Sequence, residues 1–207
     1  MPKNDSICNA YSRVWIRTIG LAVLITVAPL SARSQTNDVA SRVAAAVLPL
    51  PEAMRADATV VSSPSSGNVV LRKGTNGMVC TDETTAETFS AYCFNESFFV
   101  LLKRATELSK QLGSPDTGKP VAEALEKEIK AGKLTLPVQS SVGFAMRGPM
   151  KAYSPATQTV SGEIKSWQMV QVPYATGKAL ALPEQSSPGM PWVMAAGTWM
   201  AHIMIEH

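Results

Sequence analysis

The chain has 207 residues, 45% of them hydrophobic and 17% charged, with a formal net charge of +3, which is the composition of a globular protein. Residues 1–34 hold four of the 19 basic residues and one of the 16 acidic residues, so 15 of each sign remain in residues 35–207. This balance leaves no basic stripe for a phosphate backbone and argues against binding to nucleic acid. The length of residues 35–207 is that of one domain with its own core.

The N-terminal segment predicts a secretory signal. Lys3, Arg13 and Arg17 precede an uncharged, largely apolar run over residues 18–30. This run is shorter than the roughly 20 residues that a membrane-spanning helix needs, and small residues follow it at positions 32 and 34. We therefore expect a signal peptide over residues 1–34, a single domain over 35–207, no membrane span after cleavage, and a periplasmic or extracellular location. An uncleaved N-terminal anchor is the alternative.

The first part of this domain predicts a helix followed by strands. Asn37 or Asp38 can cap a helix that carries valines at a spacing of four and ends at Pro49, and residues 51–55 can add one more turn. Two β-branched runs follow, around a loop rich in Ser, Pro and Gly, and they predict strands over residues 58–61 and 69–73.

A tight turn is expected directly after the second of these strands. Asn76 and Gly77 form the dipeptide most typical of a two-residue hairpin, because both central positions of that turn need a positive φ. Met78 would then begin the returning strand.

Two helices are predicted in the middle of the chain. Asn95 can cap a helix that ends at Gly113, and its apolar residues fall on one stripe. These residues are Phe98, Leu101, Leu102, Ala105, Leu108 and Leu112. Pro120 can open a second helix that continues to about Ala131 and ends at Gly132.

The rest of the chain predicts strands, over about residues 141–147, 166–172, 191–194 and 199–205. Strands, then helices, then strands again are typical of an α+β domain. The expected fold is a single compact α+β domain with a mostly antiparallel sheet and two or three helices.

The cysteines predict one disulfide. Cys8 is removed with the signal peptide, which leaves Cys80 and Cys93. In an oxidising compartment an isolated pair is most simply a disulfide. A metal-binding pair or two free thiols are the alternatives, although neither cysteine belongs to a C-x-x-C motif.

Enzymatic motifs are sparse. The domain has two histidines, His202 and His207, and it lacks G-x-S-x-G, a phosphate-binding glycine loop and H-E-x-x-H. Glu206 and His202 could pair on one strand, which is a weak indication of acid–base chemistry. Catalysis is therefore the less favoured hypothesis.

The C-terminal strand carries a candidate metal site. If residues 199–205 form a strand, Trp199, Ala201, Ile203 and Ile205 lie on one face, and Met200, His202, Met204 and Glu206 on the other. Two thioethers beside an imidazole suit a soft ion such as Cu(I), and Met169 and Met194 could approach if their strands pair nearby. The favoured alternative is core packing, because methionine commonly fills gaps in cores.

Large aromatic residues offer a second kind of site. Trp167, Trp192, Trp199 and Tyr174 could form a platform for a small ligand or a protein partner. All four lie in or near strand-like segments, where aromatic side chains usually pack in the core or across strands.

Three stretches together resemble a family of uncharacterised exported bacterial proteins. They are Leu71-Arg-Lys-Gly-Thr-Asn-Gly77 with Cys80 and Cys93, the stretch Gly143-Phe-Ala-Met-Arg-Gly148, and the ending Pro191-Trp-Val-Met194 with Gly197-Thr198 and Ala201-His-Ile-Met-Ile205. The resemblance implies one secreted domain with a retained cysteine pair, and it implies no activity. Members tend to carry His-x-Met where this chain has Trp167-Gln-Met169, so a possible second imidazole is missing here.

The combined prediction is an exported binding or accessory module without catalysis, whose partner is an unknown small ligand or protein. It needs no cofactor. The alternative is a Cu(I)-binding protein that uses Met200, His202 and Met204.

Overall fold

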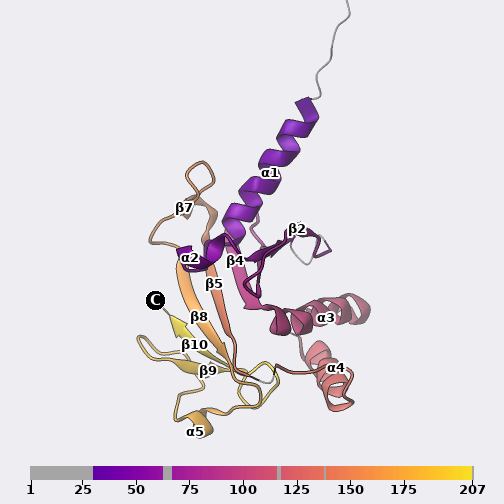
Figure 1. The fold of residues 1–207 in the computed structure, drawn as a ribbon. Helices are drawn as coiled ribbons and strands as arrows, with labels where there is room; N and C mark the ends of the chain where they lie inside the picture. Colours follow the sequence, from indigo (N-terminus) through magenta and orange to yellow (C-terminus); the bar gives the residue numbers. More distant parts are fainter. Residues whose placement is uncertain (1–29, 63–66, 116–117, 138, 207) are drawn as a thin grey trace, which may run out of the picture.

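A computed structural model describes residues 30–62, 67–115, 118–137 and 139–206, with side chains from Asp38 onward. Eight strands form one sheet in the order β2-β1-β3-β4-β5-β8-β10-β9 (Figure 1). Their bounds are β1 (Thr59–Val61), β2 (Val70–Arg72), β3 (Met78–Asp82), β4 (Thr88–Asn95), β5 (Val142–Pro149), β8 (Lys165–Gln171), β9 (Trp192–Met194) and β10 (His202–Glu206). All neighbours are antiparallel except β1 and β3.

The described residues also contain five α-helices, a short 3₁₀ helix and a small hairpin. These are α1 (Leu30–Ala46), α2 (Glu52–Arg55), α3 (Glu96–Leu112), α4 (Lys119–Lys130), α5 (Gly177–Leu180), η2 (Met150–Ala152), β6 (Tyr153–Ser154) and β7 (Thr159–Val160). The fold is the predicted single α+β domain with a mostly antiparallel sheet. In the described part of the chain, no helix combines the length and the apolar character needed to cross a membrane.

Helix α3 follows directly from β4, as its sequence predicts. Asn95 caps it by accepting a hydrogen bond from the backbone N–H of Ser97, and Gly113 ends it in the left-handed conformation with φ 59°. Most of the predicted stripe is buried, with the exception of Leu112, which is 48% exposed at the last turn.

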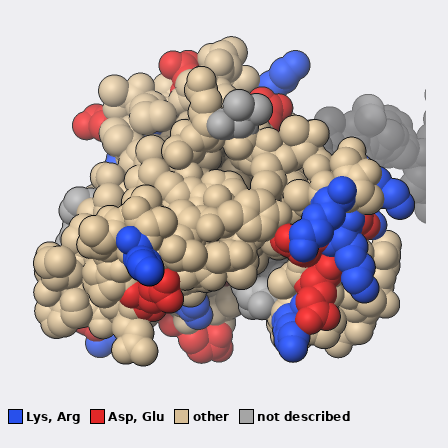
Figure 2. Space-filling view, turned by 90° about the horizontal axis from the view of Figure 1, so that it is seen from below, with Lys and Arg blue, Asp and Glu red and all other residues tan. Residues whose placement is uncertain are grey.

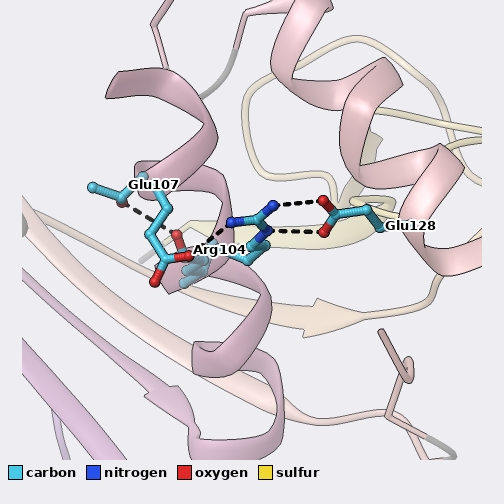
Figure 3. A network of polar contacts seen from close by, with 5 residues as sticks. Arg104, Glu107 and Glu128 are labelled. Atoms are coloured by element: carbon cyan, nitrogen blue, oxygen red, sulfur yellow. Dashed lines mark hydrogen bonds and ion pairs between the residues drawn. The ribbon is translucent and has the colours of Figure 1, made fainter. Parts of the chain in front are cut away.

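Helix α4 is held against α3 by an arginine. The Arg104 guanidinium donates two hydrogen bonds to the carboxylate of Glu128, at 2.9 and 2.6 Å, and one to Glu107 at 2.9 Å (Figure 3). These bonds lower the pKa of Glu128 below its ordinary value. The bidentate geometry fixes the two helices relative to each other.

The two faces of the sheet are packed differently, and we call them the covered face and the groove face. The covered face carries Met78, Cys80, Phe89, Ala91 and Cys93, which pack with the end of α1 and the turn after it. The groove face carries the residues that alternate with them, including Tyr92 and Phe94 on β4, and it faces α3. In Figure 1, α1 rises from one end of the sheet, and α3 and α4 lie toward the other end.

The predicted disulfide is present on the covered face. Cys80 and Cys93 are directly opposite each other on β3 and β4, both are fully buried, and their sulfurs are bonded. The bond closes a loop with a sequence separation of 13. This pairing confirms the structural interpretation of the two cysteines.

The predicted hairpin at Asn76 and Gly77 is wrong. Strand β1 lies between β2 and β3, so the two strands that flank this turn do not pair. The turn is bound to the start of β1 instead, because Asn76 N–H donates to the carbonyl of Asp57 at 3.1 Å. A Cβ on Gly74 would lie 2.2 Å from that same carbonyl oxygen, so glycine permits this close approach. Gly77 has a positive φ of 74°, but Asn76 does not.

The start of the first helix also differs from the prediction. Helix α1 begins at Leu30, so Asn37 and Asp38 lie inside the helix and do not cap it. A residue caps a helix only where the preceding backbone is not helical, and here the helix continues through residues 30–36. The expected cleavage point after Ser34 falls within α1, while residues 1–29 lie outside the described residues. The signal peptide therefore stays a prediction.

Candidate functional site: a groove beneath helix α3

A hollow of about 580 Å³, which we call the groove, lies between α3 and the groove face of the sheet. The strands contribute its floor, which consists of Thr81, Tyr92, Phe94, Arg147, Trp167, Met169, Met194, His202 and Met204. Helix α3 contributes its wall, which consists of Phe99, Leu102, Lys103, Ala105 and Thr106. Trp199 and Met200 line it from the turn before β10. The lining is mainly aromatic and thioether side chains.

The pairing of β10 with both of its neighbours brings four candidate residues together. Met204 is directly opposite Met169 on β8, and His202 is directly opposite Met194 on β9. Directly opposite residues have Cβ atoms about 4.5–5.5 Å apart and project to the same face of the sheet. The conditional approach of Met169 and Met194 that the sequence suggested is therefore confirmed.

Strand β10 is shorter than predicted, which changes the positions of Trp199 and Met200. It begins at His202, and the three residues before it form a turn in which Thr198 Oγ1 accepts from Met200 N–H at 3.2 Å. Trp199 and Met200 both line the groove, although strict alternation placed them on opposite faces. The prediction failed because alternation holds only where the backbone is extended.

Trp199 completes a series of aromatic contacts that supports the groove. Ring centroids are 6.3 Å apart for Tyr92 and Phe94, 5.7 Å for Phe94 and Phe98, and 6.3 Å for Phe98 and Trp199. Phe98 and Trp199 are 3% and 1% exposed, whereas Tyr92 and Phe94 are only partly buried. The series therefore runs from the core beneath α3 to the open floor, where it fixes the aromatic side chains.

His202 is held in one tautomer. Its Nδ1 lies 2.6 Å from the carbonyl oxygen of Met200, and a carbonyl can only accept, so Nδ1 carries the proton. Nε2 then carries the lone pair. Burial lowers the pKa of His202 below its ordinary value, although the bond to Met200 opposes that change. The imidazole is therefore neutral at neutral pH.

The charged residues near the groove are few. Lys103 and Arg147 line it together with Glu83, which accepts a hydrogen bond from Thr81 Oγ1 at 3.3 Å. Figure 2 shows how charge is distributed over one side of the molecule, where Lys, Arg, Asp and Glu gather over α3 and α4 and the broad middle is uncharged. The groove combines an apolar lining with an excess of one basic group.

The predicted aromatic platform is divided. Trp167 and Trp199 line the groove, and Trp192 packs against the cluster around Met204. Tyr174 lies elsewhere, with its hydroxyl 3.2 Å from both carboxylate oxygens of Glu126 on α4. The four residues do not form one surface.

The structure does not support the predicted pairing of Glu206 with His202. Glu206 is opposite Trp167, four residues along β10 from His202, and the Nδ1 hydrogen bond of His202 goes to Met200. His207 lies outside the described residues. Within the described ranges, no group of three or more His, Cys, Asp and Glu side chains could hold a metal ion. The groove therefore offers apolar surface and soft donors rather than acid–base pairs.

Several groove residues were not identified from the sequence. Tyr92 and Phe94 alternate with Cys93 along β4, and this alternation could have marked a face rich in aromatic residues. Lys103 and Thr106 carried no such signal, because they belong to the polar side of a helix whose position over the sheet is a tertiary feature.

Comparisons of this chain with protein-family models, with curated proteins and with solved structures find no match. The chemistry of the groove is therefore interpreted from its own residues, and the resemblance to exported bacterial proteins stays a prediction.

Proposed function

We propose that this protein is an exported, non-catalytic binding module whose groove holds a small amphiphile with an apolar body and a negatively charged end. The observation that carries the proposal is the groove itself. Its volume of about 580 Å³ lies within the range of about 300–1,000 Å³ that is usual for small-molecule sites, and its lining is mainly apolar with a few polar side chains.

The apolar body of the ligand follows from the lining. Tyr92, Phe94 and Trp167 are only partly buried, and Met194 is 44% exposed. Their apolar surface would leave water if a ligand occupied the groove, at a gain of about 25 cal/mol per Å² buried. On the opposite face of β4, beneath the end of α1, Phe89 and Ala91 are fully buried.

The charged end of the ligand follows from Lys103 and Arg147. Both are exposed and both line the groove, from α3 and from β5, whereas among the described residues the one acidic side chain in the lining is that of Glu83. A single carboxylate or sulfonate on the ligand would meet a net positive charge there, and a guanidinium binds such a group in a bidentate manner.

Export is supported by the disulfide. A buried Cys80–Cys93 bond suits a protein that matures in an oxidising compartment. The N-terminal basic and apolar segments and the resemblance to exported bacterial proteins point the same way.

The first test is displacement of N-phenyl-1-naphthylamine, a neutral apolar fluorophore, from the purified protein. We expect saturable binding with energy transfer from Trp167 and Trp199, and tighter displacement by dodecanoate than by dodecanol. Arg147→Gln should remove that difference between the two competitors and leave the affinity for dodecanol unchanged.

Two substitutions on the same helix locate the binding. Thr106→Phe adds a large side chain to the wall of the groove, whereas Val100→Phe adds it to a position of α3 that is 53% exposed and does not line the groove. We expect the Thr106 variant to lose binding by about tenfold or more and the Val100 variant to keep it. Equal binding by both variants, or no saturable binding by the parent protein, would rule out the groove as the site.

A further inference from the structure

We propose that Met169, Met194, Met200, Met204 and His202 form a binding site for Cu(I) in the floor of the groove. This inference goes beyond the binding of an amphiphile and does not depend on it. It rests on the arrangement of three strands and one turn, which brings together residues from three separate stretches of the chain.

The arrangement centres on β10. Met204 has Met169 directly opposite it on one side, and His202 has Met194 directly opposite it on the other side. Met200 precedes His202 by two residues, and its carbonyl accepts the Nδ1 proton of that histidine. All five residues line the same hollow.

The imidazole is oriented as a ligand would be. Histidines that bind metals usually donate the second ring N–H to a backbone carbonyl or a carboxylate, which fixes the tautomer and the orientation of the ring. The bond of 2.6 Å from Nδ1 to the carbonyl of Met200 meets that requirement and leaves the lone pair on Nε2. The ring atom that remains free to bind a metal is then a neutral nitrogen.

The donor set selects the ion. Four thioethers and one neutral imidazole carry no charge, and soft sulfur donors prefer Cu(I) to Zn²⁺, Mg²⁺ or Ca²⁺. Trp167 lies on the same face as Met169 and also lines the groove, so an aromatic surface adjoins the thioethers. An indole face also attracts a cation.

Packing alone does not explain Met194. Met54 and Met78 belong to the apolar cluster of the covered face, Met146 and Met150 pack around Phe89, and Met169 and Met204 are buried with Ala145, so packing accounts for each of these. Met194 is 44% exposed and fills no gap in the core, yet its register places it beside His202. A thioether that is exposed at the mouth of the groove remains accessible to an incoming ion.

The test is an anaerobic competition titration of the purified protein with Cu(I) against bathocuproine disulfonate. We expect one Cu(I) per chain. Met204→Leu and Met169→Leu keep the apolar volume and remove the thioether, and each should weaken binding by about tenfold or more, which corresponds to about 1.4 kcal/mol. His202→Asn retains a donor for the Met200 carbonyl and removes Nε2, and it should have a similar effect.

Two methionine substitutions serve as controls. Met190→Leu removes a thioether that is 54% exposed and does not line the groove, and Met146→Leu removes one on the covered face. Both should leave the affinity for Cu(I) unchanged. X-ray absorption at the copper edge should show sulfur neighbours in the parent protein and fewer of them in Met204→Leu.

The outcomes separate this site from the proposed function. Cu(I) binding that the Leu and Asn variants retain, or no stoichiometric binding by the parent protein, would overturn the inference and leave amphiphile binding untouched. Thr106→Phe should block the fluorophore while Cu(I) still binds, since that position contributes no donor. Binding of the fluorophore should in turn survive Met204→Leu, because leucine keeps the floor apolar.

Discussion

The two faces of the sheet are made by alternate residues of the same strands, yet they differ in almost every physical respect. On β4, Phe89, Ala91 and Cys93 are fully buried beneath the end of α1, whereas Tyr92 and Phe94 lie in the floor of a groove. The covered face holds the disulfide and the groove face holds the soft donors. One strand therefore contributes to a closed core on one side and to an open groove on the other.

The difference originates in how each face is covered. The last turn of α1 and the residues after it pack Ala45, Ala46 and Leu48 against buried side chains of the sheet. Helix α3 begins where β4 ends and crosses the other face, where its buried stripe packs mainly against α4 and Trp199. The strands β8, β9 and β10 are thus left with an open space between them and the helix.

The largest loss of stability should follow from a cavity made in the core of the covered face. Phe89→Ala removes a ring that is fully buried and lies 4.6 Å from the ring of Tyr153, and the cavity should reduce the free energy of unfolding by about 3–5 kcal/mol. Trp167→Ala on the groove face should cost less, about 1–2 kcal/mol, because it enlarges a space that water can already enter. Urea denaturation measures both. Equal losses would show that the groove face is as closely packed as the covered face.

The sequence predicted the elements that depend on local signals. The cap at Asn95 and the left-handed end at Gly113 were visible because capping chemistry involves only neighbouring residues. The disulfide was predicted by counting cysteines, since removal of the expected signal peptide would leave a single pair.

The order of the strands could not be predicted in the same way. Strand β1 inserts between β2 and β3 and pairs in parallel with β3, so the turn at Asn76 and Gly77 closes no hairpin. Local turn chemistry indicates that the chain reverses, but it does not determine which strand lies alongside. The same limit hid the placement of Met169 and Met194 on either side of β10, which is the central feature of the candidate site.

An intermediate loss of stability should follow from removal of the disulfide that links β3 to β4. Replacing both Cys80 and Cys93 by alanine should reduce the free energy of unfolding by about 3 kcal/mol, because the unfolded chain regains the freedom of a short loop. The side chains involved lie on the covered face, so fluorophore binding in the groove of the folded variant should persist. Chemical denaturation and the displacement titration test the two parts. Loss of binding without unfolding would show that the two faces are coupled through the bond.

The smallest expected effect is a pH dependence of the free energy of unfolding, which arises because His202 is partly buried on the groove face. Its pKa is lowered from the ordinary value of 6.5, so the unfolded chain binds a proton more readily than the folded chain. The stability that this histidine supports is complete above about pH 6.5 and is lost as the pH falls through the lower pKa of the folded state. The free energy of unfolding should therefore be smaller at about pH 5.5 than at about pH 7.5, by at most about 1.4 kcal/mol per pH unit.

His202→Asn isolates this contribution. Asparagine can still donate to the carbonyl of Met200 but does not titrate, while His207 and the carboxylates are present in both proteins and contribute equally to each. Urea denaturation at the two pH values should give a smaller difference for the variant than for the parent protein. If both proteins lose the same stability on acidification, the pKa of His202 is the same in the folded and the unfolded state. The groove face is then more open to water around β10 than around Tyr92 and Phe94.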